Sequence, residues 1–193
     1  MVVSKKGKFM RIIGGKARGT KLYTLEGDNT RPTLDRVRES LFNIIQFDVP
    51  NSVFVDLFSG SGAVGLEAIS RGAKKSIFCD KSRDAINIIK KNIDKTHCKE
   101  QTNVYQISYE ELLQNKINEK IDIIYIDPPY ETNFAYKSIN IILERNLIDN
   151  NSIIIVETDR EDVIKQIDTI ELIEIADKRK YGRAYLIFCK KKI

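Results

Sequence analysis

The stretch "VFVDLFSGSGAVG", residues 53–65, joins an apolar run to an aspartate and three regularly spaced glycines. Its first residues are β-branched and aromatic, which predicts a buried strand. Gly60, Gly62 and Gly65 then follow the pattern G-x-G-x-x-G, which makes a tight turn into a helix and lets the backbone approach a ligand closely. The stretch therefore predicts a strand, a turn and a helix that open an α/β sheet, with a ligand site at the turn.

Downstream of this unit, apolar runs alternate with segments of helical periodicity. Strands are expected at residues 75–80, 103–108, 121–127 and 151–158, and helices at 82–95, 109–116, 134–146 and 160–167. The chain ends in two strand-like runs, 171–182 and 183–191, which predict a hairpin. This alternation predicts a mostly parallel, Rossmann-like sheet with helices on both faces and an antiparallel hairpin at one edge.

The amino-terminal part has a different pattern. "MRIIGG" at 10–15 and "GTKLYTL" at 19–25 predict two short strands joined by a turn, and 31–47 predicts a helix with Thr33 as its N-cap. We therefore divide the chain into a small basic β-hairpin extension, residues 1–30, and a Rossmann-like α/β domain, residues 31–193.

Composition narrows the function. The net charge of +5 is unevenly placed: residues 1–38 hold ten Lys and Arg against three acids, residues 178–193 hold seven against none, and the middle is acidic. Such clustering indicates a basic face for a polyanion. A single histidine gives little support to histidine metal sites or to Ser-His-Asp triads, so no metal is expected. Three scattered cysteines, no signal peptide and no membrane-length apolar run predict a cytoplasmic protein without a membrane partner.

The glycine loop alone permits NAD or FAD, because Asp80 ends the next strand twenty residues after Gly60, where a ribose-binding acid is expected. Asp56, however, lies four residues before Gly60, and a carboxylate there would repel a pyrophosphate. It suits a ligand with a positive charge. S-adenosylmethionine carries an ammonium, a sulfonium and a ribose diol but no phosphate. Asp80 then accepts the ribose hydroxyls, and Ser108, after the third strand, is a candidate for the adenine edge.

"DIIYIDPPYE", residues 122–131, places a second group at a strand end. Two prolines stop the strand and stiffen the corner. An exocyclic amine of a nucleobase is a poor nucleophile, and two acceptors that hold its hydrogens orient its nitrogen for attack. Asp127 and the Pro128 carbonyl supply such acceptors, Pro129 holds them rigidly, and Tyr130 offers a ring for base stacking.

Asp127-Pro128-Pro129-Tyr130 resembles the [DNS]-P-P-[YFW] signature of Rossmann-fold methyltransferases that modify exocyclic nitrogens. Together with "MRIIGGKARGTKLYT", "RPTLDRVRESLFNII", "DLFSGSGAVGLEAISRGA" and "YGRAYLIFCKK", it makes almost the whole chain similar to the bacterial 16S ribosomal RNA guanine-N2 methyltransferase family. The resemblance implies S-adenosylmethionine as cofactor and one guanine of small-subunit RNA as substrate, in an assembled or partly assembled particle. We expect the enzyme to be a monomer. The same resemblance implies two sets of site residues. The catalytic residues are Asp127, Pro128, Pro129 and Tyr130, and the cofactor residues are Asp56, Ser59, Gly60, Ser61, Gly62, Asp80, Lys81, Ser108 and Asp127. Ser108 departs from the family, whose members commonly carry an acid there.

Basic residues at both ends of the chain are the expected RNA contacts, since Lys and Arg neutralise phosphates. Arg31 and Thr33 have an alternative role in closing over the cofactor. The expected RNA-binding residues are Arg11, Lys16, Arg18, Lys21, Arg31, Arg36, Arg38, Arg179 and Arg183.

Three other functions stay open on the sequence. A DNA adenine-N6 methyltransferase also uses a glycine loop and DPPY, but the chain has no region long enough for a separate DNA-recognition domain. A non-catalytic RNA-binding adaptor on the same fold is the second, and the intact Asp127 to Tyr130 corner argues against it. An oxidoreductase is the third, and it would bind NAD in place of S-adenosylmethionine.

Overall fold

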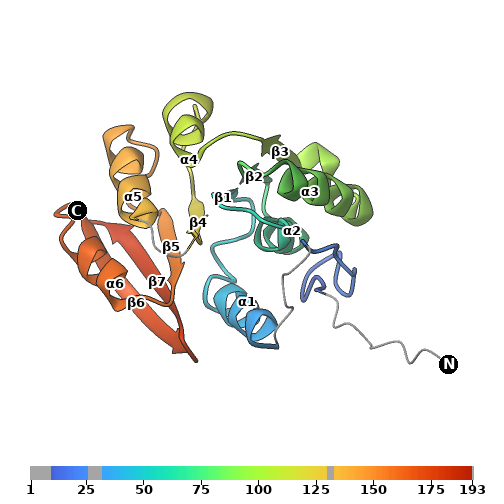
Figure 1. Cartoon of the computed structure of the whole chain (residues 1–193), viewed down its shortest axis with the longest axis horizontal. Coiled ribbons are helices and arrows are strands. Elements are labelled where there is room, and N and C mark those ends of the chain that lie inside the picture. Colours follow the sequence, from blue (N-terminus) through green and yellow to red (C-terminus); the bar gives the residue numbers. More distant parts are fainter. Residues whose placement is uncertain (1–9, 26–31, 130–132, 193) are drawn as a thin grey trace.

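The computed structural model describes residues 10–25, 32–129 and 133–192, without the side chains of residues 32–34. Within these ranges the chain forms a seven-stranded sheet in the order β3-β2-β1-β4-β5-β7-β6 (Figure 1). The strands are β1 Val53–Asp56, β2 Lys75–Cys79, β3 Thr102–Tyr105, β4 Ile123–Ile126, β5 Ile153–Thr158, β6 Ile173–Tyr181 and β7 Ala184–Lys191. Strands β1 to β5 are parallel, and β7 runs antiparallel to both β5 and β6. The predicted Rossmann-like fold is confirmed, with β7 inside the sheet and β6 at its edge.

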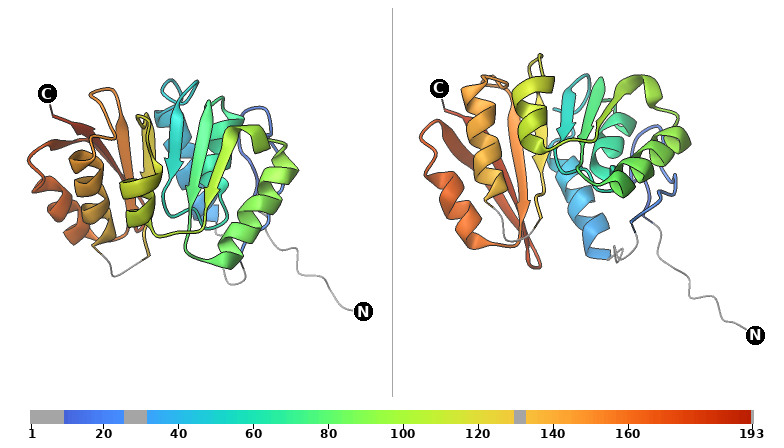
Figure 2. Two further views of the ribbon diagram at one scale, coloured as in Figure 1. Left: turned by 90° about the horizontal axis from the view of Figure 1, so that it is seen from above. Right: turned by 45° about the horizontal axis from the view of Figure 1, so that its top comes forward.

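Helices cover both faces of this sheet (Figure 2). Residues of α1 Pro32–Ile44, α2 Ala63–Ser70 and α3 Arg83–Thr96 share one buried cluster with one face of the sheet. Residues of α4 Tyr109–Glu111, α5 Phe134–Glu144 and α6 Glu161–Asp168 share a second cluster with the other face. A turn of π-helix, η2 Leu112–Lys116, continues α4, and a 3₁₀ turn, η1 Lys99–Gln101, precedes β3. No described helix is both long and apolar enough to cross a membrane.

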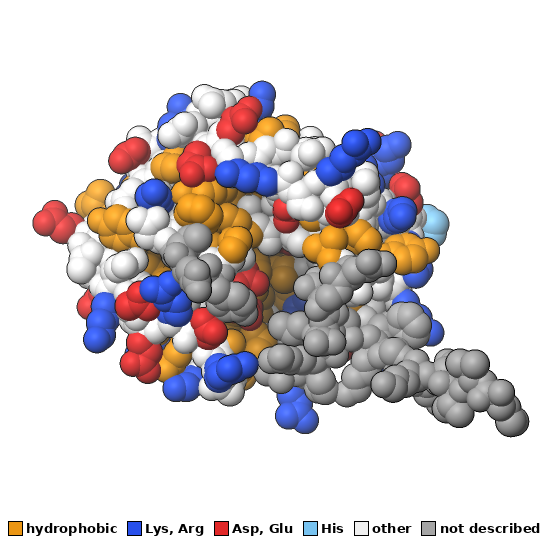
Figure 3. All heavy atoms as spheres, in the orientation of Figure 1, with side chains coloured by type: hydrophobic (Ala, Val, Ile, Leu, Met, Phe, Trp, Pro, Cys, Tyr) orange, Lys and Arg blue, Asp and Glu red, His pale blue; other side chains and the backbone are white. Residues whose placement is uncertain are grey.

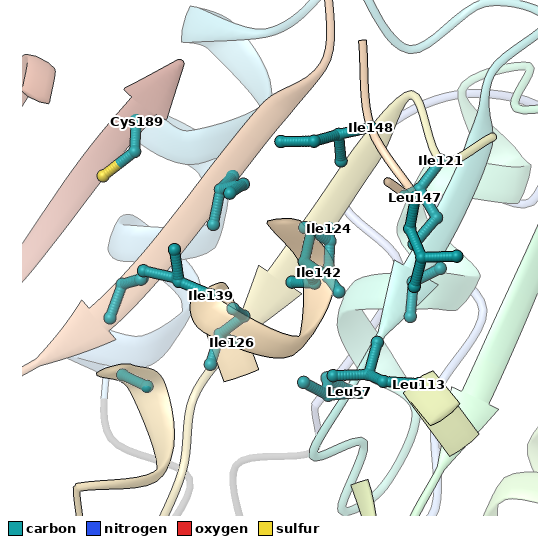
Figure 4. Packing of buried hydrophobic residues seen from close by; sticks show 14 of the residues in the cluster. Leu57, Leu113, Ile121, Ile124, Ile126, Ile139, Ile142, Leu147, Ile148 and Cys189 are labelled. Carbon is teal, nitrogen blue, oxygen red and sulfur yellow. The ribbon is translucent and has the colours of Figure 1, made fainter. Parts of the chain in front are cut away.

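Alternate side chains of each strand belong to different clusters, because successive side chains of a strand point to opposite faces of the sheet. Phe54 of β1 joins the cluster under α1 to α3, and its neighbour Val55 joins the cluster under α4 to α6. Ile139 and Ile142 of α5 lie over β4 (Figure 4). Each fully buried side chain of this size contributes about 1.5–3 kcal/mol.

The order of the strands fixes where a ligand can bind. The chain passes from β1 outward to β2 and β3 and then returns to place β4 on the other side of β1. The connections on the two sides of this point lead to opposite faces of the sheet, which leaves a crevice outside the carboxyl ends of β1 and β4. Asp56 and the residues after Ile126 lie at this crevice.

The amino-terminal segment differs from the predicted hairpin. Residues 10–25 form a single isolated antiparallel bridge, Arg11 to Lys21, in place of two strands. Ile12 and Leu22 are buried in the cluster of α1 to α3. The two runs still exchange backbone hydrogen bonds, from Leu22 N–H to the Met10 carbonyl and between Ile12 and residues 19 and 20. Other backbone groups of the segment bind polar side chains of α2 and α3. This segment therefore shares the core of the α/β domain.

Three buried side chains hold this segment. Glu67 of α2 accepts hydrogen bonds of 2.7 Å from the backbone N–H groups of both Ile13 and Gly14. The Ser70 hydroxyl donates to the Gly14 carbonyl and accepts from the Ala17 N–H. Asn92 of α3 accepts from the Tyr23 N–H and donates to the Tyr23 carbonyl. We call residues 10–25 the anchored arm.

The beginning of α1 also differs from the prediction. The helix starts at Pro32, so Thr33 lies inside its first turn and is not the N-cap. Proline is favoured at this first position, because its missing N–H would have no partner in the helix. Arg31 lies outside the described residues.

Candidate active site

A pocket of about 520 Å³ opens at the carboxyl ends of β1, β2, β4 and β5. Residues from the glycine loop, from the corner after β4 and from both ends of the anchored arm line it. Figure 3 shows the molecule hollowed near its centre, with apolar and acidic side chains in the hollow. The pocket therefore brings together the two motifs that the sequence placed at strand ends.

Asp56 ends β1 at the floor of this pocket and is only 1% exposed. Its Oδ2 accepts a hydrogen bond of 3.0 Å from the Gly65 N–H, at the start of α2. Burial raises the pKa of Asp56 to about 7, the Gly65 hydrogen bond opposes this shift, and the Asp80 carboxylate adds to it. A positively charged ligand group in the pocket would relieve this cost of burying a carboxylate.

The three glycines of the loop have different tasks. Gly60 has φ +53°, lines the pocket, and a Cβ there would meet nothing within 4 Å, so the space beside it is open to a ligand. Gly62 has φ +76° and does not line the pocket; a Cβ there would approach Ile89 at 3.1 Å. A Cβ on Gly65 would lie 2.4 Å from the Phe78 ring. Gly62 and Gly65 are thus required by the turn and by helix-strand packing.

Asp80 follows β2 and closes the glycine loop from the other side. Its Oδ2 accepts from the Gly60 N–H at 2.9 Å, and its Oδ1 accepts from the Ser82 N–H at 2.8 Å. These two bonds fix the carboxylate at the pocket wall. Each oxygen keeps a second lone pair, so Asp80 can still accept from a ribose diol.

The corner after β4 forms the wall beside Asp56. Asp127, Pro128 and Pro129 all line the pocket, while Tyr130 lies outside the described residues. The Asp127 side chain is exposed to the pocket, but protein atoms surround it and reduce its contact with bulk water. This desolvation, together with the carboxylates of Glu157, Asp56 and Asp159, raises the pKa of Asp127.

The remaining expected cofactor residues have mixed positions. Ser59, Ser61 and Lys81 line the pocket. The Ser59 hydroxyl donates to the Asp56 carbonyl at 2.6 Å and accepts from the Cys79 N–H, so it braces the loop. Ser108 is not among the pocket-lining residues; its hydroxyl accepts from the Glu111 N–H and caps α4. Ser108 thus caps α4 and does not line the described pocket wall, where the adenine edge was expected.

Two groups in the pocket were missed from the sequence. Phe58, Tyr109 and Phe134 form an aromatic wall, with Tyr109 4.9 Å from Phe134 and 5.2 Å from Phe58 between ring centroids. Glu157, near the carboxyl end of β5, hydrogen-bonds to the Tyr125 hydroxyl in the same pocket. Glu157 was detectable by the rule that found Asp127, because it also lies near a strand end.

The expected RNA-binding residues are mostly on the surface. Arg38 is the exception: it is 6% exposed and donates to the Arg11 carbonyl at 2.5 Å. It also pairs with Asp35 and lies 4.0 Å from Glu67, so it is not available to a phosphate, and the expected contact is corrected. Arg31 lies outside the described residues. The exposed residues are Arg11, Lys16, Arg18, Lys21, Arg36, Arg179 and Arg183.

Charge separates the pocket from the surface. The described pocket lining holds four acids, Asp56, Asp80, Asp127 and Glu157, against the two bases Arg38 and Lys81. The anchored arm and the β6–β7 hairpin instead carry exposed Lys and Arg. The pocket thus favours a cationic or hydrogen-donating ligand, and phosphates are attracted to the surface outside it.

Comparison with known proteins agrees with this geometry. Residues 10–190 match the family model described as conserved hypothetical protein 95. The ribosomal RNA small subunit methyltransferase D of Haemophilus influenzae is 38% identical over 154 residues, which cover 79% of this chain and 80% of that protein. The protein of the same name from Escherichia coli strain K12 is 32% identical, covering 79% and 76%.

Solved structures give the same result. The yhhF protein of Escherichia coli superimposes with a TM-score of 0.82 at 26% identity, covering 96% of this chain and 100% of that one. HI0767 of Haemophilus influenzae superimposes with a TM-score of 0.79 at 32% identity, and the match again covers 96% of this chain and 100% of that one. The chain is therefore a methyltransferase and belongs to the conserved hypothetical protein 95 family, together with the small-subunit methyltransferases D that it resembles.

Proposed function

We propose that this enzyme transfers the methyl group of S-adenosylmethionine to the N2 amine of one guanine in 16S ribosomal RNA. One observation carries the proposal: Asp127 lies in the same pocket as Asp56 and the open side of Gly60. The named relatives act on small-subunit ribosomal RNA. Neither a DNA adenine methyltransferase nor a non-catalytic adaptor is favoured by these relatives.

The residues of the pocket fit S-adenosylmethionine better than a dinucleotide. Asp56 presents a buried carboxylate to the ligand's ammonium, and the open space beside Gly60 accommodates its methionine part. Asp80 is oriented to accept from the ribose diol. Four acids in the lining would repel a pyrophosphate. When bound, the cofactor supplies an activated methyl group.

The chain's own contribution to the reaction is positioning. Asp127 and the Pro128 carbonyl accept the two hydrogens of the amine, so that its nitrogen faces the cofactor site. The two prolines keep these acceptors in place before the base arrives. Tyr130 is proposed to stack on the base, which must leave its helix or lie in an open loop to enter.

RNA outside the pocket is proposed to follow the basic surface. Lys16 and Arg18 lie at the turn of the anchored arm, where the Lys16 N–H binds the Ser70 carbonyl at the end of α2. Met10 and Leu25 line the pocket near the start of α2. An eight-residue helix is roughly 12 Å long, so the basic turn would contact phosphates some nucleotides away from the target base. We propose a monomer acting in the cytoplasm on an assembled or partly assembled small subunit.

A methylation assay tests the proposal. Small subunits from cells lacking the protein are incubated with the enzyme and methyl-labelled S-adenosylmethionine, and the RNA is digested to nucleosides. The expected product is N2-methylguanosine in 16S RNA. Labelled N6-methyladenine in a DNA substrate, with no label in the subunits, would contradict the proposal. Asp168→Ala, which changes an exposed acid on α6, is the matched control for Asp127→Ala.

A further inference from the structure

The corner after β4 explains how an amine is held, but not how guanine is chosen. Adenine and cytosine also carry an exocyclic amine, and two acceptors at Asp127 and Pro128 would hold any of them. A selective enzyme needs another group that reads the ring beside the amine. This question rests on the proposed function.

Glu157 occupies the position next to Asp127. In the parallel pairing of β4 with β5, Ile126 lies opposite Val156, so Asp127 and Glu157 are the next residues on two adjacent strands. Both side chains line the pocket. Two carboxylates therefore stand side by side along the wall that faces the base.

Tyr125 orients the second carboxylate. It lies on β4 two residues before Asp127, on the same face of the sheet, and is 4% exposed. Its hydroxyl donates a hydrogen bond to Oε2 of Glu157. That bond uses one carboxylate oxygen, while Oε1 remains able to accept from a ligand.

The edge of guanine matches this pair of acceptors. Its N2 amine and its N1–H are adjacent donors on one edge of the ring. Adenine and cytosine present a ring nitrogen with a lone pair beside their amine, which would face the carboxylate as acceptor against acceptor. We infer that Glu157, held by Tyr125, accepts the N1–H of guanine and thereby selects guanine while Asp127 holds the amine.

The sharpest probe is 2-aminopurine, which keeps the N2 amine but has a lone pair at N1. Small subunits are reconstituted with guanosine or 2-aminopurine at the position that the wild-type enzyme methylates, and kcat/KM is measured for each. Wild type is expected to prefer guanosine about 10- to 100-fold, the usual range for a matched donor-acceptor pair on a base. Glu157→Gln presents an amide that can donate to N1, so the preference should fall to within about threefold.

Further variants separate selection from folding. Tyr125→Phe removes the hydroxyl that orients Glu157. It should reduce the preference for guanosine over 2-aminopurine, but by less than Glu157→Gln does. Glu174→Gln, an exposed change on β6, should keep the full wild-type preference. Calorimetric titration of Glu157→Gln should show that the variant still binds S-adenosylmethionine, which reports an intact pocket.

The outcomes distinguish the two proposals. An unchanged preference in Glu157→Gln, or an equal loss on both substrates, would overturn the role of Glu157. Absence of guanosine methylation by the wild-type enzyme on any small subunit would instead overturn the proposed function.

Discussion

The Gly60 N–H donates a hydrogen bond of 2.9 Å to Asp80, which joins the glycine loop to the end of the neighbouring strand. One carboxylate thus shapes the loop and lies at the proposed ribose site. Asp80→Ala should weaken binding of S-adenosylmethionine by roughly 1.5–3 kcal/mol, because charge-assisted hydrogen bonds are lost. Calorimetric titration measures this, with Asp94→Ala on the exposed side of α3 as control. Equal affinities of wild type and Asp80→Ala would refute the assignment.

Asp127→Ala should lower turnover far more than cofactor affinity, because the acceptor that it removes acts mainly in the transition state. The loss should be about 10²–10³-fold, as for other single positioned electrostatic groups. Single-turnover methylation of undermethylated small subunits measures it, and Asp168→Ala should behave as wild type. Chemistry at the full rate in Asp127→Ala would remove this residue from the mechanism.

Cofactor affinity should depend on pH through Asp56, whose pKa is raised to about 7 by burial. Below pH 7 the carboxyl takes up a proton and loses its attraction for the ammonium, so affinity should fall, by up to about tenfold per pH unit, and level off above pH 7. Titrations from pH 5 to 8 measure this. Asp80 is the charged neighbour that contributes to the shift, so Asp80→Asn should move the midpoint downward. In Asp56→Asn, which keeps an acceptor for Gly65, the change in affinity centred near pH 7 should disappear. If the affinity of Asp56→Asn changes with pH as that of the wild type does, the pH dependence belongs to another group.

Glu67 should be essential for stability. It is fully buried, accepts from Ile13 and Gly14, and pairs with Arg71 at 2.8 Å. Glu67→Ala leaves the N–H groups of Ile13 and Gly14 and the Arg71 guanidinium without their acceptor and should cost about 3–5 kcal/mol in the free energy of unfolding. Urea denaturation provides the measurement. Glu119→Ala, which breaks the exposed pair with Lys75, is the matched control and should cost at most about 1 kcal/mol. Similar costs for the two variants would contradict the anchoring role.

The turn of the anchored arm should contribute to RNA affinity and to its salt dependence. The double variant Lys16→Ala/Arg18→Ala should reduce the slope of log K against log salt by about one per lost phosphate contact. Filter binding at several salt concentrations measures this slope. Lys116→Ala/Lys165→Ala removes two exposed charges from η2 and α6, on the other face of the sheet, and serves as control. A slope that is the same in both variants would show that the turn does not meet RNA.

The fold and the acids at the strand ends could be predicted from the sequence, because both follow from local periodicity. Asp56, Asp80 and Asp127 each end an apolar run, and the carboxyl ends of parallel strands meet at one edge. The polar contacts of Glu67 and Asn92 escaped this reasoning, since their partners lie 53 to 69 residues away and leave no local signal. Arg38 was misplaced because charge clustering does not reveal which member of a cluster is buried.

The anchored arm also constrains the order in which the chain can acquire its structure. Residues 10–25 leave the ribosome before α2 and α3 do, and the groups that bind their backbone, Glu67 and Asn92, follow 54 and 69 residues later. At translation rates of about 5–20 residues per second, Tyr23 waits roughly 3–14 s for Asn92 to be synthesised. The anchored arm is thus fixed only after α2 and α3 have been made. The wall of the pocket that Met10 and Leu25 provide can therefore form only after Asn92 is made, while the walls at Asp127 and Glu157 are synthesised later still.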